Sequence, residues 1–117
     1  MEANMTVEKI VKVLDNKKAE EIKVLKISEL TVMADYFIIA NGTSNTHVRA
    51  LAEEVEAELS DVGVEPRSIE GRATGWILLD YSDVVVHVFT ARDREYYNLE
   101  RLWQDGEEID VSSLISE

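Results

Sequence analysis

Residues 76–90 read Trp-Ile-Leu-Leu-Asp-Tyr-Ser-Asp-Val-Val-Val-His-Val-Phe-Thr, two apolar runs separated by Ser82-Asp83. So short a separation predicts an antiparallel hairpin, although Ser-Asp is not a preferred pair for a two-residue turn. If Tyr81 pairs with Val84, the side chains divide between two faces of a sheet, because successive residues of a strand point to opposite sides. One face is then almost wholly apolar and is predicted to be core. Its members are Ile77, Leu79, Tyr81, Val84, Val86 and Val88.

The other face of this hairpin mixes apolar and polar side chains. Its predicted cross-strand pairs are Trp76 with Phe89, Leu78 with His87, and Asp80 with Val85. A buried core rarely holds Asp and His without partners, and an exposed surface rarely gathers Trp, Leu and Phe. An apolar patch with a few polar anchors is typical of a protein–protein site. Two alternatives stay open: a C-terminal helix that covers this face with His87 bonded inside, and a homodimer contact.

Three stretches have the apolar spacing of helices. The first runs from Val7 to Asn16, with Thr6 as its cap. The second follows the turn 41–44, with Thr43 or Ser44 as its cap, and stops at Gly63. The last begins at a cap residue, Asp93, and continues to about Trp103, before Gly106.

Five strands are predicted, at 22–28, 35–41, 67–69, 76–81 and 84–90, with a flexible connection at 71–75. The segment 35–41 is apolar on both faces and is expected at the centre, whereas 22–28 alternates and is expected at an edge or with one wet face. The order of elements predicts an α/β (α+β) fold, a mixed five-stranded sheet covered by helices. We expect one domain over residues 1–106 and an acidic, poorly ordered tail over 107–117.

Composition narrows the class of protein. The chain has 117 residues, no Cys and a formal net charge of −12. That length suits one compact domain, and the absence of Cys excludes disulfides and thiolate metal sites. No apolar run approaches the roughly 20 residues that span a membrane, and no secretory signal is visible, so we expect a cytoplasmic protein. Basic residues are scattered, which argues against direct sequence-specific binding of nucleic acid. The acidity either favours basic partners or serves solubility alone.

No catalytic constellation emerges from the sequence. Gly42-Thr43-Ser44 before a helix could hold a phosphate, but the phosphate-binding glycine motifs are absent. A nucleotidyltransferase of this layout would carry two carboxylates, two residues apart, on the following strand, and 67–69 has none. The turn is therefore interpreted as a helix cap. Neither a metal site nor a catalytic triad can be assembled around His47 and His87. We expect no enzyme activity, no cofactor and no metal.

Several stretches together carry a family likeness. They are Ala34–Ala40, Gly42-Thr43-Ser44, residues 71–81, residues 83–89 and residues 94–103. The most specific part is Trp-x-Leu-Leu-Asp-Tyr and Val-Val-His-Val-Phe, followed by Arg-Glu-Tyr-Tyr-x-Leu-Glu. In these stretches the chain resembles the ribosomal silencing factor (Iojap-like) family. The resemblance implies a nucleotidyltransferase-like fold that lacks the catalytic carboxylates.

The resemblance also implies a function. Such a protein would bind ribosomal protein L-fourteen of the large ribosomal subunit and sterically prevent joining of the small subunit, repressing translation when nutrients are short. A homodimer is also implied. Alternatives are a large-subunit assembly factor, as organelle relatives look to be, and a nucleotide-binding enzyme with a transferase-like fold. The expected contact residues are Trp76, Leu78, Asp80, Val85, His87 and Phe89 on the hairpin, with Tyr96 and Tyr97 nearby.

Overall fold

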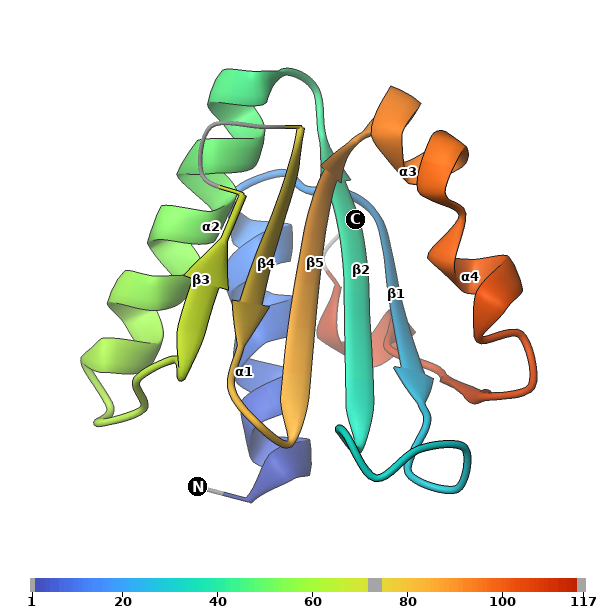
Figure 1. The fold of residues 1–117 in the computed structure, drawn as a ribbon. Coiled ribbons are helices and arrows are strands. Elements are labelled where there is room, and N and C mark those ends of the chain that lie inside the picture. The colour runs from blue at the N-terminus through green and yellow to red at the C-terminus, as the bar shows by residue number, and fades with distance from the viewer. Residues whose placement is uncertain (1, 72–74, 116–117) are drawn as a thin grey trace.

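The computed structural model describes residues 2–71 and 75–115 and consists of one sheet with helices on both sides (Figure 1). The helices are α1 (Ala3–Asn16), α2 (Asn45–Ser60), α3 (Ala91–Tyr97) and α4 (Leu99–Leu102), with a short 3-10 helix at Ser112–Leu114. The strands are β1 (Glu20–Lys26), β2 (Tyr36–Gly42), β3 (Ser68–Glu70), β4 (Trp76–Asp80), β5 (Val84–Thr90) and β6 (Glu107–Ile109). The connection predicted at 71–75 falls largely on residues 72–74, which lie outside the described residues.

The strands lie in the order β3-β4-β5-β2-β1-β6. Only the β2–β5 pair is parallel among the pairings within the described ranges, so the sheet is mixed, as predicted. β2 lies at the centre, as its two apolar faces indicate. The predicted number of five strands is wrong, because the sheet has six.

The sixth strand lies in the segment expected to be a poorly ordered tail. β6 pairs with the outer edge of β1, where Ile109 lies opposite Val24. Val111 follows it and is 7% exposed, packed in the main core. The expectation of poor order is therefore wrong for residues 107–115. A strand of three residues, two of them exposed glutamates, has no apolar alternation to reveal it. Its order comes from backbone hydrogen bonds to an otherwise open strand edge.

One face of the sheet carries the main core. α1 and α2 pack against it, behind the sheet in the view of Figure 1. The predicted apolar side of the hairpin points into this core, where all but one of its members are at most 1% exposed and Tyr81 is half-buried. The period-two assignment of the hairpin faces is thus confirmed.

The helix boundaries differ from prediction at both ends of the chain. α1 begins at Ala3, so Thr6 lies inside it, and its hydroxyl donates to the carbonyl of Glu2 (3.1 Å) instead of capping the helix. At α3 the cap is Thr90, whose hydroxyl accepts from the Asp93 backbone N–H (3.2 Å). The predicted single last helix breaks at Asn98, which adopts a left-handed conformation with φ 47°. Asn tolerates this conformation better than most residues.

Candidate functional site

The β4–β5 hairpin has the predicted register. Trp76 lies opposite Phe89, Leu78 opposite His87, and Asp80 opposite Val85. The two-residue turn closes because Ser82 takes a positive φ of 72°, and the Tyr81 N–H donates to the Val84 carbonyl (2.9 Å). The six predicted residues therefore lie on one face of the sheet, opposite the main core.

This second face is only partly covered. α4 places Leu99 and Trp103 against a cluster that includes Phe37 and Phe89. Between α4 and the β3–β4 edge a groove of about 590 Å³ remains. Its lining is contributed by Val32, Met33, Ala34, Phe37, Arg67, Glu70, Trp76, Leu78, Asp80, Val85, His87, Leu99 and Trp103. The sequence left open that a C-terminal helix covers this face. In the structure such a helix covers only part of it.

The groove divides the predicted residues into two groups. Val85 and His87 are buried at its base, and Phe89 is fully buried and stacks on Trp76 with ring centroids 5.0 Å apart. Trp76, Leu78 and Asp80 are half-buried. Three of the six are thus largely inaccessible to a partner, which sequence alternation cannot reveal because it does not show what α4 covers.

A second hollow of about 290 Å³ lies beside the groove. It is lined by Glu70, Gly71, Trp76, Leu78, Asp93 and Tyr97. Glu70, Trp76 and Leu78 line both hollows, and the two apolar side chains among them, Trp76 and Leu78, form a ridge between the hollows. We call this pair the Trp76–Leu78 ridge.

The predicted tyrosines of α3 lie at this end of the site. The ring centroids of Tyr97 and Trp76 are 4.6 Å apart, and Tyr97 lines the second hollow. Tyr96 is largely exposed and contacts Tyr97 edge-on, with centroids 5.1 Å apart.

His87 is bonded inside the protein. It is 4% exposed, and the indole Nε1–H of Trp76 donates to its Nδ1 (3.2 Å). Because Nδ1 accepts, the proton of the neutral ring is on Nε2, and Nε2 has no partner among the described residues. Burial lowers the pKa of His87 to about 4, so the ring is neutral at physiological pH.

Asp80 is held by its own chain. Its carboxylate accepts from Arg67 Nη2 (2.6 Å) and from the Ser82 backbone N–H (2.8 Å). Burial opposes ionisation, but the bonds from Arg67 and Ser82 outweigh it and lower the pKa of Asp80 below its ordinary value. Asp80 therefore stabilises the hairpin turn and presents a partly neutralised charge at the groove.

Sequence reasoning missed an apolar rim on the loop between β1 and β2. Val32 is fully exposed and Met33 largely so, and both line the groove. Leu30 in the same loop and Leu102 on α4 are also exposed. Large apolar side chains in a connecting loop were the available signal, because loop residues without a core role are usually polar.

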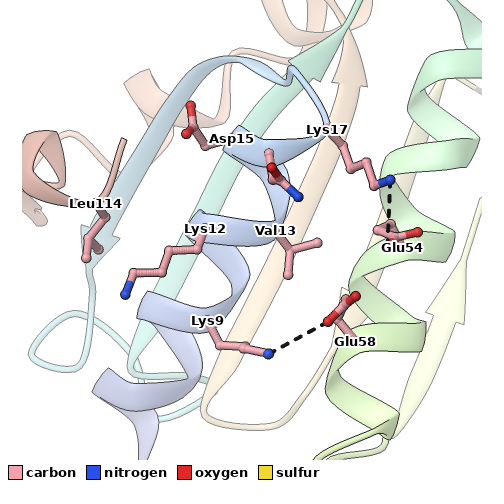
Figure 2. A pocket seen from close by; sticks show the side chains of 9 residues that line it. Lys9, Lys12, Val13, Asp15, Lys17, Glu54, Glu58 and Leu114 are labelled. Carbon is pink, nitrogen blue, oxygen red and sulfur yellow. Dashed lines mark ion pairs between the residues drawn. The ribbon is translucent and has the colours of Figure 1, made fainter. Parts of the chain in front are cut away.

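Another groove, about 450 Å³, lies between α1 and α2 and is lined mainly by charged side chains (Figure 2). Lys9 pairs with Glu58 (3.8 Å) and Lys17 with Glu54 (4.0 Å), while Lys12 points away from α2. Its charged side chains are partly or fully exposed and are of both signs. Such pairs contribute little energy, and this groove reads as a solvated surface between two helices.

The Gly42-Thr43-Ser44 turn has the geometry of a cap. Ser44 Oγ accepts from the backbone N–H of His47 (3.1 Å), and the Thr43 N–H donates to the Nδ1 atom of His47 (2.9 Å). Nε2 of His47 in turn donates to the Lys17 carbonyl (2.9 Å). Two of the backbone N–H groups that an anion could use, those of Thr43 and His47, are thus bonded within the protein.

Residues 2–71 and 75–115 contain no group of three His, Cys, Asp or Glu side chains placed to hold a metal ion. They also contain no helix with the length and apolar character needed to cross a membrane.

Known proteins resemble this chain over almost its full length. Residues 1–117 match the family described as "Ribosomal silencing factor during starvation". The chain is 39% identical over 107 residues to ribosomal silencing factor RsfS of Halalkalibacterium halodurans, covering 91% of this chain and 92% of that protein. It is 41% identical over 98 residues to RsfS of Bacillus subtilis, covering 83% of each. A mitochondrial Iojap-related protein of Arabidopsis thaliana is 32% identical over 104 residues, covering 85% of this chain and 56% of that protein.

Solved structures show the same fold. A crystal structure of a Chromobacterium violaceum protein has a TM-score of 0.87 at 36% identity and covers 94% of this chain and 92% of its own. A crystal structure of a Bacillus halodurans protein has a TM-score of 0.81 at 35% identity and covers 92% and 98%.

Proposed function

Because this chain belongs to the ribosomal silencing factor family, we propose that it represses translation by occupying the large ribosomal subunit. The contact is made with ribosomal protein L-fourteen, on the face that meets the small subunit. Bound there, the protein sterically prevents the two subunits from joining. We place this action in the cytoplasm.

The observation that carries the proposal is the Trp76–Leu78 ridge between two hollows. A half-buried Trp beside apolar hollows is the kind of residue that dominates binding energy in protein interfaces. The groove, the second hollow and the apolar rim of Val32 and Met33 form one continuous strip of lining residues. A strip with aromatic residues at its centre and charged groups at its margin matches the usual anatomy of an interface.

Charge supports the choice of partner. The chain has a net charge of −12, and carboxylates of Glu70 and Asp93 line the second hollow beside the ridge. Ribosomal proteins are basic, so long-range attraction speeds encounter and short-range contacts follow. Repulsion from ribosomal RNA works against non-specific binding elsewhere on the subunit.

This mechanism needs occupancy and no bond chemistry. The histidine rings of the described chain are engaged in internal hydrogen bonds, through Nδ1 in His87 and through both nitrogens in His47. A bound globular domain on the joining face is an obstacle by its volume alone. Affinity, set by the ridge and its hollows, then determines how many subunits are silenced.

Co-sedimentation with purified large subunits tests the proposal. Wild-type protein is expected in the subunit fraction, and Trp76→Ala is expected to reduce its affinity at least about 30-fold, the effect of losing an aromatic anchor worth about 2 kcal/mol. Val62→Ala removes an exposed apolar side chain beyond the end of α2 and serves as the matched control. A wild-type protein that stays in the supernatant at low salt would contradict the proposal.

A second copy of the chain is the competing occupant of the same strip. Homodimer formation through the ridge would make self-association and subunit binding mutually exclusive. Sedimentation equilibrium of wild type and Trp76→Ala measures this directly, since a ridge-mediated dimer dissociates in the variant.

A further inference from the structure

The ring of His87 is too deeply buried to be a contact residue of the site. It is 4% exposed and lies under the aromatic cluster, with Phe37 edge-on at 4.8 Å and Phe89 stacked at 6.2 Å. Its one polar contact among the described residues is with Trp76, whose Nε1–H donates to Nδ1 (3.2 Å). The hydrogen-bonded route from His87 to the Trp76–Leu78 ridge therefore runs through the indole of Trp76.

We propose that His87 is a positioning residue, which holds the Trp76 indole in the orientation of the ridge before any partner arrives. This inference rests on the proposed function, because it concerns the same site. In this role His87 does not touch the partner. It acts as a fixed hydrogen-bond acceptor at the base of the groove. Trp76 is then presented between the two hollows in one rotamer instead of several.

A positioning role explains an imidazole at this place better than a packing role does. A buried neutral His keeps a donor on Nε2 that has no partner in the described part of the chain, which is unfavourable for folding. A Leu or Phe at the same position would fill the space without that penalty, and its neighbours Val86, Val88 and Phe89 are apolar. Stability alone therefore does not account for an imidazole here, whereas an acceptor at Nδ1 does.

Pre-organisation determines the size of the expected effect. A side chain that is already fixed loses less conformational freedom when a partner binds, which is worth from about twofold to about tenfold in affinity. Burial also keeps the ring unprotonated, so Nδ1 remains an acceptor at physiological pH.

Three variants separate positioning from packing. His87→Leu removes the acceptor, and we expect it to unfold at no lower temperature than wild type while binding large subunits about 5-fold to 10-fold more weakly. His87→Asn offers Oδ1 close to the place of Nδ1 and is expected to recover most of the affinity. In a Trp76→Phe background, which has no indole N–H, His87→Leu should change affinity less than twofold.

An equal loss from His87→Leu in both backgrounds, or no loss in either, would overturn the proposal. If His87→Leu does not fold, His87→Phe provides a second apolar replacement and the same cycle is run with it. The affinity of each variant is compared with that of the wild-type protein. If the wild-type protein does not bind large subunits, that result contradicts the proposed function and not the positioning role.

An NMR readout tests positioning without any ribosome. The indole N–H signal of Trp76, assigned by its absence in Trp76→Phe, should be protected from hydrogen exchange in wild type and in His87→Asn, and should lose protection in His87→Leu. An indole proton that exchanges at the same rate in wild type and in His87→Leu would overturn the role of His87 on its own.

Discussion

The guanidinium of Arg94 bonds to the carboxylate of Glu100 across the break between α3 and α4, with Nε 2.8 Å from Oε1. The same guanidinium donates through Nη1 to Asn41 Oδ1 (2.9 Å) and to the Glu21 carbonyl (2.5 Å). Lys23 also reaches Glu100 (3.0 Å). One arginine therefore fastens the helical segment that covers the second face to the ends of β1 and β2.

Removing this arginine should loosen α3 and α4. Arg94 is 11% exposed, and its bond to Glu100 is the main reason that the pKa of Glu100 is lowered. We expect Arg94→Ala to reduce the free energy of unfolding by about 2 kcal/mol, because a buried Asn41 oxygen and a partly buried carboxylate lose their donor. Urea denaturation followed by circular dichroism measures it. Arg49→Ala, on the exposed surface of α2, is the control and should change stability by less than about 0.5 kcal/mol.

The pH dependence of stability should carry the signature of His87. Its pKa is about 4 in the folded protein and 6.5 ordinarily. As pH falls below about 6.5, the unfolded chain binds a proton that the folded chain does not, so the free energy of unfolding decreases until about pH 4. The full difference corresponds to about 3 kcal/mol.

Between pH 5 and about pH 6.5, the effect of His87 on stability can be separated from the titration of the carboxyls with lowered pKa values. Arg67, Glu70 and Asp80 line the same groove. The carboxyls with lowered pKa values, Asp80, Glu100 and Asp110, start from 3.8, 4.5 and 3.8 and so stay ionised there. Denaturation at pH 7, 6 and 5 should show a decrease for wild type and a smaller one for His87→Asn. Equal slopes for the two proteins would show that burial of the imidazole is not the cause.

The carboxyl of Asp80 should titrate below its ordinary pKa of 3.8. Its bonds to Arg67 and Ser82 favour the ionised form, and Arg67→Gln should move the pKa upward by removing the charged donor. Carbon-detected NMR titration of the side chain measures both values. Because Arg67 is well exposed, the effect on overall stability should be small. An unchanged Asp80 pKa in the variant would mean that the pair is not formed in solution.

Order in the last segment can be tested at Val111. Its side chain packs in the main core, so Val111→Ala should lower the free energy of unfolding by about 1–2 kcal/mol through lost burial and a small cavity. Ser113→Ala, exposed in the neighbouring 3-10 helix, should have almost no effect. If both variants unfold at the same urea concentration as wild type, the segment after Gly106 contributes nothing to the fold.

Residues with a strong periodic pattern were predictable. The register of β4 and β5 follows from a short turn and the two-residue period, and the central place of β2 follows from its two apolar faces. Features that are short, or that depend on tertiary contacts, were not predictable. β6 is ordered by pairing with β1, and the break at Asn98 is a single left-handed residue within a helical pattern.

For the candidate site, the sequence predicted which side chains share one face of the sheet, but it did not predict which of them are buried. Trp76 and Leu78 remain accessible as predicted, but the burial of His87 and Phe89 depends on where α4 places Trp103 and on the position of Phe37. Neither can be read from strand alternation. Arg67, the partner of Asp80, directly precedes β3, and β3 comes to lie beside Asp80 only in the folded sheet.

The most direct test of the central claim is light scattering during the joining of purified large and small subunits. Large subunits incubated with wild-type protein are expected to join small subunits to a lower extent as the protein concentration rises, while Trp76→Ala should need at least about 30-fold more protein for the same effect. Full joining in the presence of saturating, demonstrably bound wild-type protein would contradict the account.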